Sequence, residues 1–267
     1  MRYFIGLVAM FMCLFSVEAV SQTPASDDAL LAKTRDLYDA PFTRDLISFD
    51  CAVQFDWKQH FVDLLGSVPP AATPTVERLQ TIQHRVFVDR SGAVVSAIPN
   101  APDLSGVAHG AELEGAFNAM IAGGLNAWMP FSTNVILPVS PTKFNFEKIQ
   151  SGYRLILNGS GVAATLLLGL DMRLTSGVSQ LPQPMRFTTE FSQGSDGFLL
   201  SSVKTGDTTD AAATKDATFT YTYQPVRGFQ LPATVTIKPA VPETWHYSLT
   251  DCKAMTGVTI KVALPKK

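Results

Sequence analysis

The sequence predicts an α+β protein, in which a large curved antiparallel sheet, resembling a half-barrel, is covered by an amphipathic helix. Apolar and polar side chains alternate in three runs within residues 216–253, and apolar side chains recur every three or four positions over residues 107–128. Turns rich in Gly and Pro separate many further short apolar runs. A period of two places alternate side chains on one face of a strand, and a period of 3.6 forms one stripe on a helix.

The stretch 216–253 is the clearest β segment and is expected to form a three-stranded meander. In each run Phe, Tyr, Trp, Val, Ile or Leu occupies every second position, with Thr, Ser or His between them. We expect one face of this meander to be buried. Pro225, Pro232 and Pro239 are expected in its turns, because proline cannot donate a ladder hydrogen bond.

The first residues are typical of an export signal. Arg2 precedes an apolar run over residues 4–15, which is too short for a stable membrane span, and a small residue, Ala19, marks the expected cleavage site. We expect residues 1–19 to be removed and the mature protein to be periplasmic or secreted; a retained N-terminal anchor is the alternative. The mature chain is expected to contain no transmembrane segment.

Composition limits the classes of partner and chemistry. Charged residues make up 16% of the chain and the net charge is -2, so no basic stripe favours nucleic acid. The four histidines show no metal-ligand spacing, and we expect no metal and no cofactor. The run 158–161, Asn-Gly-Ser-Gly, lacks the first glycine of a nucleophile elbow and is interpreted as a turn. We find no catalytic motif and therefore do not expect an enzyme.

Two cysteines remain in the mature chain, and an even pair in an exported protein favours a disulfide between Cys51 and Cys252. Two buried free thiols are the alternative. Cys51 shares its parity with the apolar positions of its strand, whereas Cys252 shares the polar parity of His246. Either a bulge near Asp251 changes the phase of that strand, or the bridge does not form.

The remaining elements are assigned in chain order. Residues 20–46 are expected to form a linker and a short N-terminal helix, followed by a single β-rich domain over 47–267 with its helical insert at 107–128. Pro130 is expected to end the inserted helix. A short helical turn is expected over 58–65, and further strands over 47–57, 76–88, 93–98, 153–157, 164–175, 185–191, 198–204 and 258–264.

The apolar side of the helix and the aromatic side of the meander are candidates for lining a cavity. An ordinary packed core is the alternative interpretation of the same residues. The positions that we expect to contact an apolar ligand are Phe117, Ile121, Leu125 and Trp128 of the helix and Tyr221, Tyr223 and Trp245 of the sheet.

One segment resembles a known family. Tyr223, Gly228, Phe229, Leu231 and Pro232 follow a pattern of Tyr, turn, Gly, aromatic and Leu-Pro that is similar to the end of bacterial outer-membrane lipoprotein-carrier (lipoprotein-sorting) domains. The order of elements, with a helical segment inserted before a long run of strands, also resembles that superfamily. The resemblance implies a half-barrel with a helical lid, whose concave apolar surface holds lipid or acyl chains. It does not imply that this chain carries lipoproteins, and the chain is longer than the small carriers.

These observations lead to three hypotheses about function. The first is an exported, non-enzymatic cell-envelope protein that binds a lipid or another apolar ligand between sheet and helix. The second is an envelope interaction or scaffold module with a solid core, which uses exposed loops such as residues 206–215 to contact an envelope protein. The third is a secreted hydrolase whose active-site residues are scattered along the sequence.

Overall fold

The structure is a computed structural model of the 267-residue chain. It describes residues 26–97, 110–133, 136–137, 143–159, 162–180, 184–209, 216–240 and 243–257. The expected signal peptide at 1–19 and the expected strand at 258–264 lie outside these residues, as does most of the loop 206–215.

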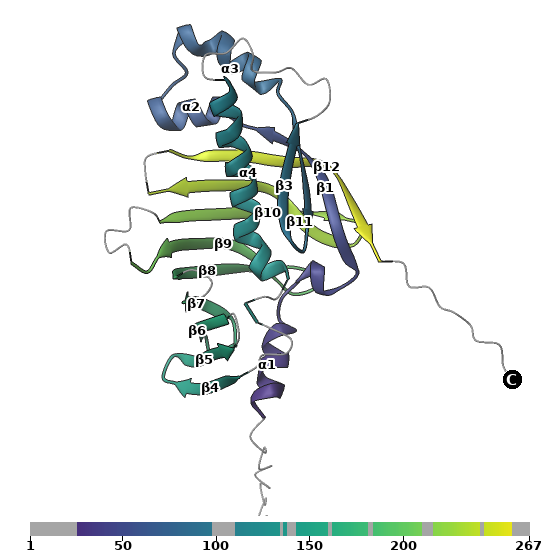
Figure 1. Ribbon diagram of the computed structural model, residues 1–267, viewed down its shortest axis with the longest axis vertical. Helices are drawn as coiled ribbons and strands as arrows, with labels where there is room; N and C mark the ends of the chain where they lie inside the picture. Colours follow the sequence, from purple (N-terminus) through teal and green to yellow (C-terminus); the bar gives the residue numbers. More distant parts are fainter. Residues whose placement is uncertain are drawn as a thin grey trace, which may run out of the picture.

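A single open antiparallel sheet dominates the fold, as predicted (Figure 1). Its order is β3-β2-β1-β12-β11-β10-β9-β8-β7-β6-β5-β4, so that within the described chain β1 and β12 are the one pair of neighbours distant in sequence. The twelve strands are β1 (Leu46–Phe55), β2 (His84–Asp89), β3 (Gly92–Ala97), β4 (Phe144–Ile149), β5 (Gly152–Gly159), β6 (Val162–Leu168), β7 (Leu174–Ser179), β8 (Met185–Gln193), β9 (Phe198–Asp207), β10 (Ala217–Val226), β11 (Phe229–Pro239) and β12 (Trp245–Thr256).

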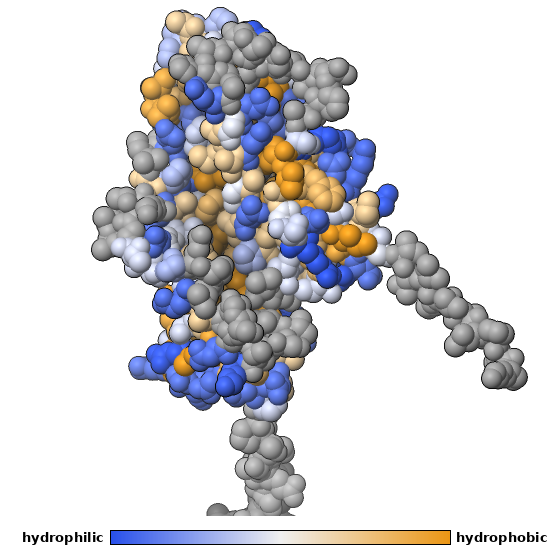
Figure 2. Space-filling model, viewed as in Figure 1, coloured by the Kyte–Doolittle hydropathy of each residue, from blue (hydrophilic) through white to orange (hydrophobic). Residues whose placement is uncertain are grey.

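The helices cover one face and both ends of the sheet. The long helix α4 (Gly110–Ser132) runs across the strands, α2 (Trp57–Leu65) and α3 (Thr73–Gln80) lie at one end, and α1 (Asp27–Arg35) lies near the other (Figure 1). Two 3-10 turns complete this set: η1 (Pro41–Thr43) precedes β1, and η2 (Pro70–Ala72) lies between α2 and α3. Hydrophobic side chains reach the surface around α4 in the middle of this face, whereas the end that holds β4 and β5 is largely hydrophilic (Figure 2).

The predicted strand over 76–88 is wrong in its first half, which forms α3. Pro74 lies in the first turn of this helix, where a missing N–H costs little. Val76 and Leu79 are three positions apart and are both buried, which is the spacing of one helix face. Without a longer periodic window, the sequence could not separate this short helix from a strand.

The predicted strand over 164–175 is two strands, β6 and β7, joined by a tight turn. Met172 has a φ of 67°, and Gly169 donates its N–H to the carbonyl of Arg173, so the chain reverses here. Most of β7 and the whole of β4 lie outside the strands predicted from the sequence. Each is six residues long, and in neither do buried and exposed positions alternate regularly.

All three prolines expected in turns pair within the ladder instead. Pro225 pairs with Gln230, and Pro232 pairs with Tyr223 next to a register shift. The reversal itself falls at 227–228, where both residues have positive φ. Proline is tolerated in a strand at an irregularity that does not require its missing N–H.

Pro239 likewise pairs at the end of β11, with Ala217. Pro130 does not end α4, which continues to Ser132. Because Pro130 lies in the last turn, it removes one intrahelical hydrogen bond without another full turn to disrupt.

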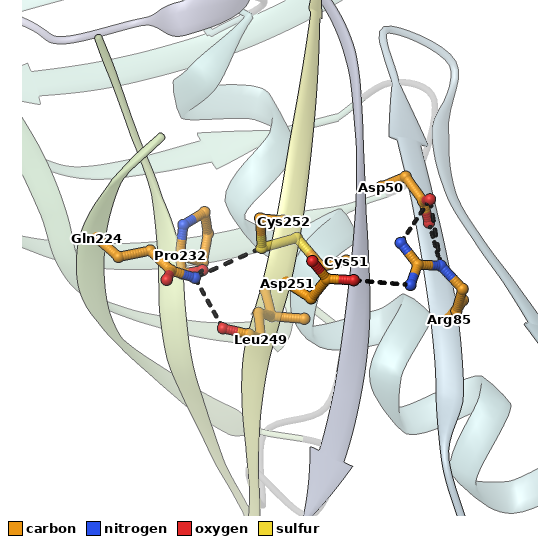
Figure 3. Close-up of a disulfide and its surroundings, with 8 residues drawn as sticks. All are labelled: Asp50, Cys51, Arg85, Gln224, Pro232, Leu249, Asp251 and Cys252. Atoms are coloured by element: carbon orange, nitrogen blue, oxygen red, sulfur yellow. Dashed lines mark hydrogen bonds and ion pairs between the residues drawn. A yellow bond between two sulfur atoms is a disulfide. The ribbon is translucent and has the colours of Figure 1, made fainter. Parts of the chain in front are cut away.

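The predicted Cys51–Cys252 disulfide is present and ties β1 to β12 (Figure 3). The conflict in parity is resolved by a bulge at the predicted place. Asp251 has a φ of 46°, and the pairing of β1 with β12 shifts between Asp50 and Ala52. This extra residue changes the phase of β12, and Cys252 therefore meets Cys51, which is fully buried.

Polar contacts surround the disulfide (Figure 3). Arg85 Nη2 pairs with Asp50 Oδ2 at 2.6 Å, and Arg85 Nη1 lies 3.5 Å from Asp251 Oδ2. On the other side, Gln224 Nε2 donates to the carbonyl of Leu249 at 2.7 Å. The bulge therefore has partners on β2 and β10, the strands beyond its immediate neighbours β1 and β11.

Candidate functional site

The predicted helix residues lie on one face of α4, and that face packs against the sheet. Phe117, Ile121, Leu125 and Trp128 are each at most 3% exposed. Their spacing of three and four positions puts them on a single stripe, as expected from the sequence. The structure therefore brings the four side chains to the concave face of the sheet.

Tyrosine hydroxyls from the sheet hold the backbone of α4. Tyr221 Oη donates to the carbonyl of Gly124 at 2.8 Å, and Tyr247 Oη donates to the carbonyl of Ile121 at 3.1 Å. Tyr247 was not among the predicted positions, although it alternates with the predicted Trp245 on the same face of β12. Each helical carbonyl can accept a second hydrogen bond beside the one within the helix.

Tyr223 makes a third contact of this kind, toward a side chain instead of the helix backbone. Trp128 Nε1 donates to Tyr223 Oη at 3.1 Å, and the same hydroxyl donates to the carbonyl of Leu200 at 2.7 Å. Burial raises the pKa of Tyr221, Tyr223 and Tyr247 above the ordinary value of 10.0. All three therefore stay protonated and remain donors throughout the physiological range.

Gly124 lets the helix approach the sheet closely. A β-carbon at this position would overlap the hydroxyl of Tyr247 and would lie 3.0 Å from Val235 Cγ1 and 3.2 Å from Ile237 Cδ1. Any other residue would push α4 away from the strands. The middle of the interface is therefore filled by direct contact between helix and sheet.

The aromatic side chains form separate clusters instead of lining one cavity. Trp57 and Phe117 meet edge to face with ring centroids 4.2 Å apart, and His60 stacks on Trp245 at 4.0 Å. Trp128, near the other end of α4, instead contacts two phenylalanines of the N-terminal segment and β1. The predicted set is thus divided between the two ends of the helix.

A narrow apolar crevice lies at the C-terminal end of α4. Its volume is about 10 Å³, enough for about one water molecule. Tyr38 Oη closes one side by accepting the N–H of Leu174 at 2.6 Å, and burial raises the pKa of this hydroxyl to about 12. The lining residues are Tyr38, Pro130, Phe131, Ile136, Leu137 and Leu174.

A second hollow lies on the opposite face of the sheet and was missed by sequence reasoning. Its volume is about 420 Å³. The floor comes from β1, β11 and β12, and the walls come from the beginning of α2 and the end of α3. We call it the outer groove, and its lining residues are Gln54, Phe55, Asp56, Gln59, Gln80, Thr234, Val235, Thr236, His246, Tyr247 and Ser248.

A hydroxyl, an imidazole and a carboxylate form a chain at this groove. Thr236 Oγ1 lies 3.1 Å from His246 Nδ1, and His246 Nε2 lies 3.0 Å from Asp63 Oδ2. Hydrogen bonds from Gln59 and then His246 lower the pKa of Asp63. The order of groups is that of a nucleophile, a base and the residue that orients the base.

The backbone of Thr236 offers no donor for an acyl-transfer reaction. Thr236 lies in the interior of β11, paired with Thr220 on one side and His246 on the other, so its backbone groups belong to the ladders. Thr236 therefore has no free N–H of its own to stabilise a developing oxyanion. Thr236, His246 and Asp63 instead connect α2 to the outer face of the sheet.

The described residues hold no group of three or more His, Cys, Asp or Glu side chains arranged to bind a metal ion. Within the same part of the chain, no helix combines the length and hydrophobicity needed to cross a membrane.

Comparisons with known proteins do not identify the chain. No family model matches it, and no curated protein matches it. A solved structure with some similarity is a LolA superfamily protein from Nitrosomonas europaea, with 12% identity and a TM-score of 0.32 over 88% of this chain and 96% of that one. That protein carries the name of a superfamily that the sequence resembles, but a likeness at this level carries no argument about function.

Proposed function

We propose that this protein is an exported, non-enzymatic binding protein of the cell envelope. Its ligand would be a lipid or another apolar molecule on the concave face of the sheet, and α4 would act as a lid over that face. The export signal is part of this proposal, because residues 1–19 lie outside the described structure.

The observation that supports an apolar ligand is the crevice at the C-terminal end of α4. It adjoins a concave face on which β5 and β6 bury four leucines, each exposed by 3% or less. A chain of CH₂ groups gains roughly 0.8 kcal/mol for each group that it buries against such a surface. Because the crevice holds about 10 Å³, an acyl chain enters only if α4 moves outward.

The contacts of α4 are compatible with such a movement. The tyrosine hydroxyls bond to carbonyls that keep their own intrahelical partners, so the helix stays intact when these contacts break. Each such hydrogen bond contributes about 1 kcal/mol net. The hydroxyls hold α4 against the sheet, but the helix does not need them to form.

A locked lid tests the proposal. Val235 Cγ1 lies 3.0 Å from the β-carbon position of Gly124, so cysteines at 124 and 235 are near enough to bridge. Tyr247→Phe removes the hydroxyl that would overlap the new side chain. The locked protein is Gly124→Cys/Val235→Cys/Tyr247→Phe, and its matched control is Tyr247→Phe alone.

The readout is titration with a fluorescent fatty acid. We expect saturable binding by the wild type, tighter apparent binding by Tyr247→Phe because its lid opens more readily, and loss of binding in the bridged protein. Equal binding by the bridged protein and its control would contradict the proposal that α4 acts as a lid. Mass analysis establishes that the engineered bridge has formed.

The close fit at Gly124 favours a second candidate, a scaffold or interaction module with a solid core. In that case none of the three proteins binds the fatty acid, and the purified wild type recovers an envelope protein partner. The loop expected to make this contact, 206–215, lies mostly outside the described residues.

A further inference from the structure

The outer groove is built from polar side chains on a rigid floor. Thr234, Thr236, His246 and Ser248 project from β11 and β12 on the face opposite to α4, because their neighbours Val235 and Tyr247 point into the core. Its volume of about 420 Å³ falls within the range typical of small-molecule sites.

The chemistry of the lining disfavours anions and metal ions. None of the lining residues is Lys or Arg, and Asp56 contributes a carboxylate, so an anion such as phosphate has no cationic partner here. A metal ion is also disfavoured, since both ring nitrogens of His246 are occupied by Thr236 and Asp63. The groove suits a neutral ligand.

Peptides and lipids fit poorly for different reasons. An added peptide strand needs a free sheet edge, but β1, β11 and β12 each have a strand on both sides. An acyl chain needs apolar walls, whereas the side chains that project into the groove are hydroxyls, amides, a carboxylate and an imidazole.

We propose that the outer groove binds a neutral ligand rich in hydroxyl groups, of the size of a mono- or disaccharide. The Ser248 and Thr236 hydroxyls can each donate and accept, as sugar hydroxyls do. Gln54 uses its Nε2 on the carbonyl of Gln80 at 3.0 Å, which fixes the side chain and leaves its oxygen as an acceptor. Gln59 is similarly held by its bond to Asp63 at 2.7 Å.

The groove and the lid lie on opposite faces of the sheet and share only Val235 and Tyr247, whose side chains point toward α4. Strand alternation separates the groove from the concave face, and neither α4 nor the crevice contributes a residue to it. A saccharide and an apolar ligand would therefore bind without competing, and failure of one proposal leaves the other standing.

NMR titration of the full mature chain with maltose and with chitobiose tests the proposal. We expect saturable shifts for at least one sugar, centred on Thr234, His246 and Ser248. The variant Thr234→Val/Ser248→Ala should weaken this binding by roughly tenfold, since it removes two hydroxyl partners. Thr188→Val, an exposed threonine on the same kind of surface of β8, is the control and should bind as the wild type does.

Three results would overturn the proposal. The first is that neither sugar gives saturable shifts, and the second is that the shifts lie outside the groove. The third is that Thr188→Val weakens binding as much as the double variant does. Inorganic phosphate and laurate are titrated in parallel, and binding of either at these residues in place of sugar would also contradict it.

Discussion

Replacing Cys51 and Cys252 by alanine removes a covalent link between the two strand neighbours that are most distant in sequence. The disulfide closes a loop with a sequence separation of 201 residues. In the chain-entropy treatment, a loop of this length stabilises the folded state by about 5 kcal/mol, because the unfolded chain is constrained. That is a large share of the 5–15 kcal/mol that is typical of whole domains.

Urea unfolding of the wild type and of Cys51→Ala/Cys252→Ala measures the effect. With an m-value of about 2–3 kcal/mol/M, a loss of about 5 kcal/mol moves the midpoint down by about 2 M. Refolding should also slow, since pairing β1 with β12 then requires closing the whole loop unaided.

The single variants separate the bridge from local packing. Cys51→Ala and Cys252→Ala each break the link, so either should cost nearly as much as the double variant. Small, additive effects of the single variants would refute the reasoning, because they would mean that the side chains matter and the link does not. A midpoint shift worth less than about 1 kcal/mol in the double variant would refute it as well.

Two further predictions follow from individual side chains. Gly124→Ala should destabilise the protein by about 1 kcal/mol or more, although alanine has the better helix propensity. Gly123→Ala is the control and should stabilise the protein by up to about 1 kcal/mol, because a β-carbon there meets nothing within 4 Å. Equal effects of the two variants in urea unfolding would contradict the close approach of α4 at Gly124. Burial lowers the pKa of His84 below its ordinary value of 6.5, and its Nδ1 has no partner among the described residues. As the pH falls, His84 therefore binds a proton at a higher pH in the unfolded chain than in the folded one, so stability should fall as pH drops below about 6.5. His84→Leu should flatten this fall in melting experiments between about pH 7 and 5. Parallel losses in both proteins would exclude His84 as the cause.

The elements that the sequence predicts well are those whose pattern extends over several turns or strands. The meander 216–253 alternates in three consecutive runs, and the helical stripe of α4 repeats over most of its length. The bulge at Asp251 was predictable because two independent signals, strand parity and cysteine pairing, conflicted there. A conflict of this kind localises an irregularity that neither signal shows alone.

The elements that were missed depend on information outside their own segment. α3 holds two buried side chains, which fit a short helix as well as a strand. Pro232 fits into β11 because the register shifts beside it, and that shift involves a partner strand. Local propensity cannot report such pairings.

The candidate sites show the same limit. The predicted helix and sheet residues do meet, but Tyr247 and Gly124 determine how closely α4 approaches the sheet. These two residues are more than a hundred positions apart in the sequence. The outer groove was missed because Thr234 and Ser248 look like an ordinary solvated face. The pair His246 and Asp63 could have indicated the groove, but the two residues are distant in sequence and their contact is visible only in the structure.

The closeness of α4 to the sheet limits what a lid can do. A glycine in a helix costs about 1 kcal/mol relative to alanine, and Gly124 offsets this by allowing the tyrosine contacts and dense packing. If those contacts favour the closed form by about 3 kcal/mol, roughly one molecule in 150 is open, and the apparent dissociation constant of a ligand rises by the same factor. A binding protein built this way holds its ligand weakly enough to release it. In a scaffold the same contacts would only add stability, so the change in ligand affinity on Tyr247→Phe distinguishes the two roles more directly than any measurement of stability.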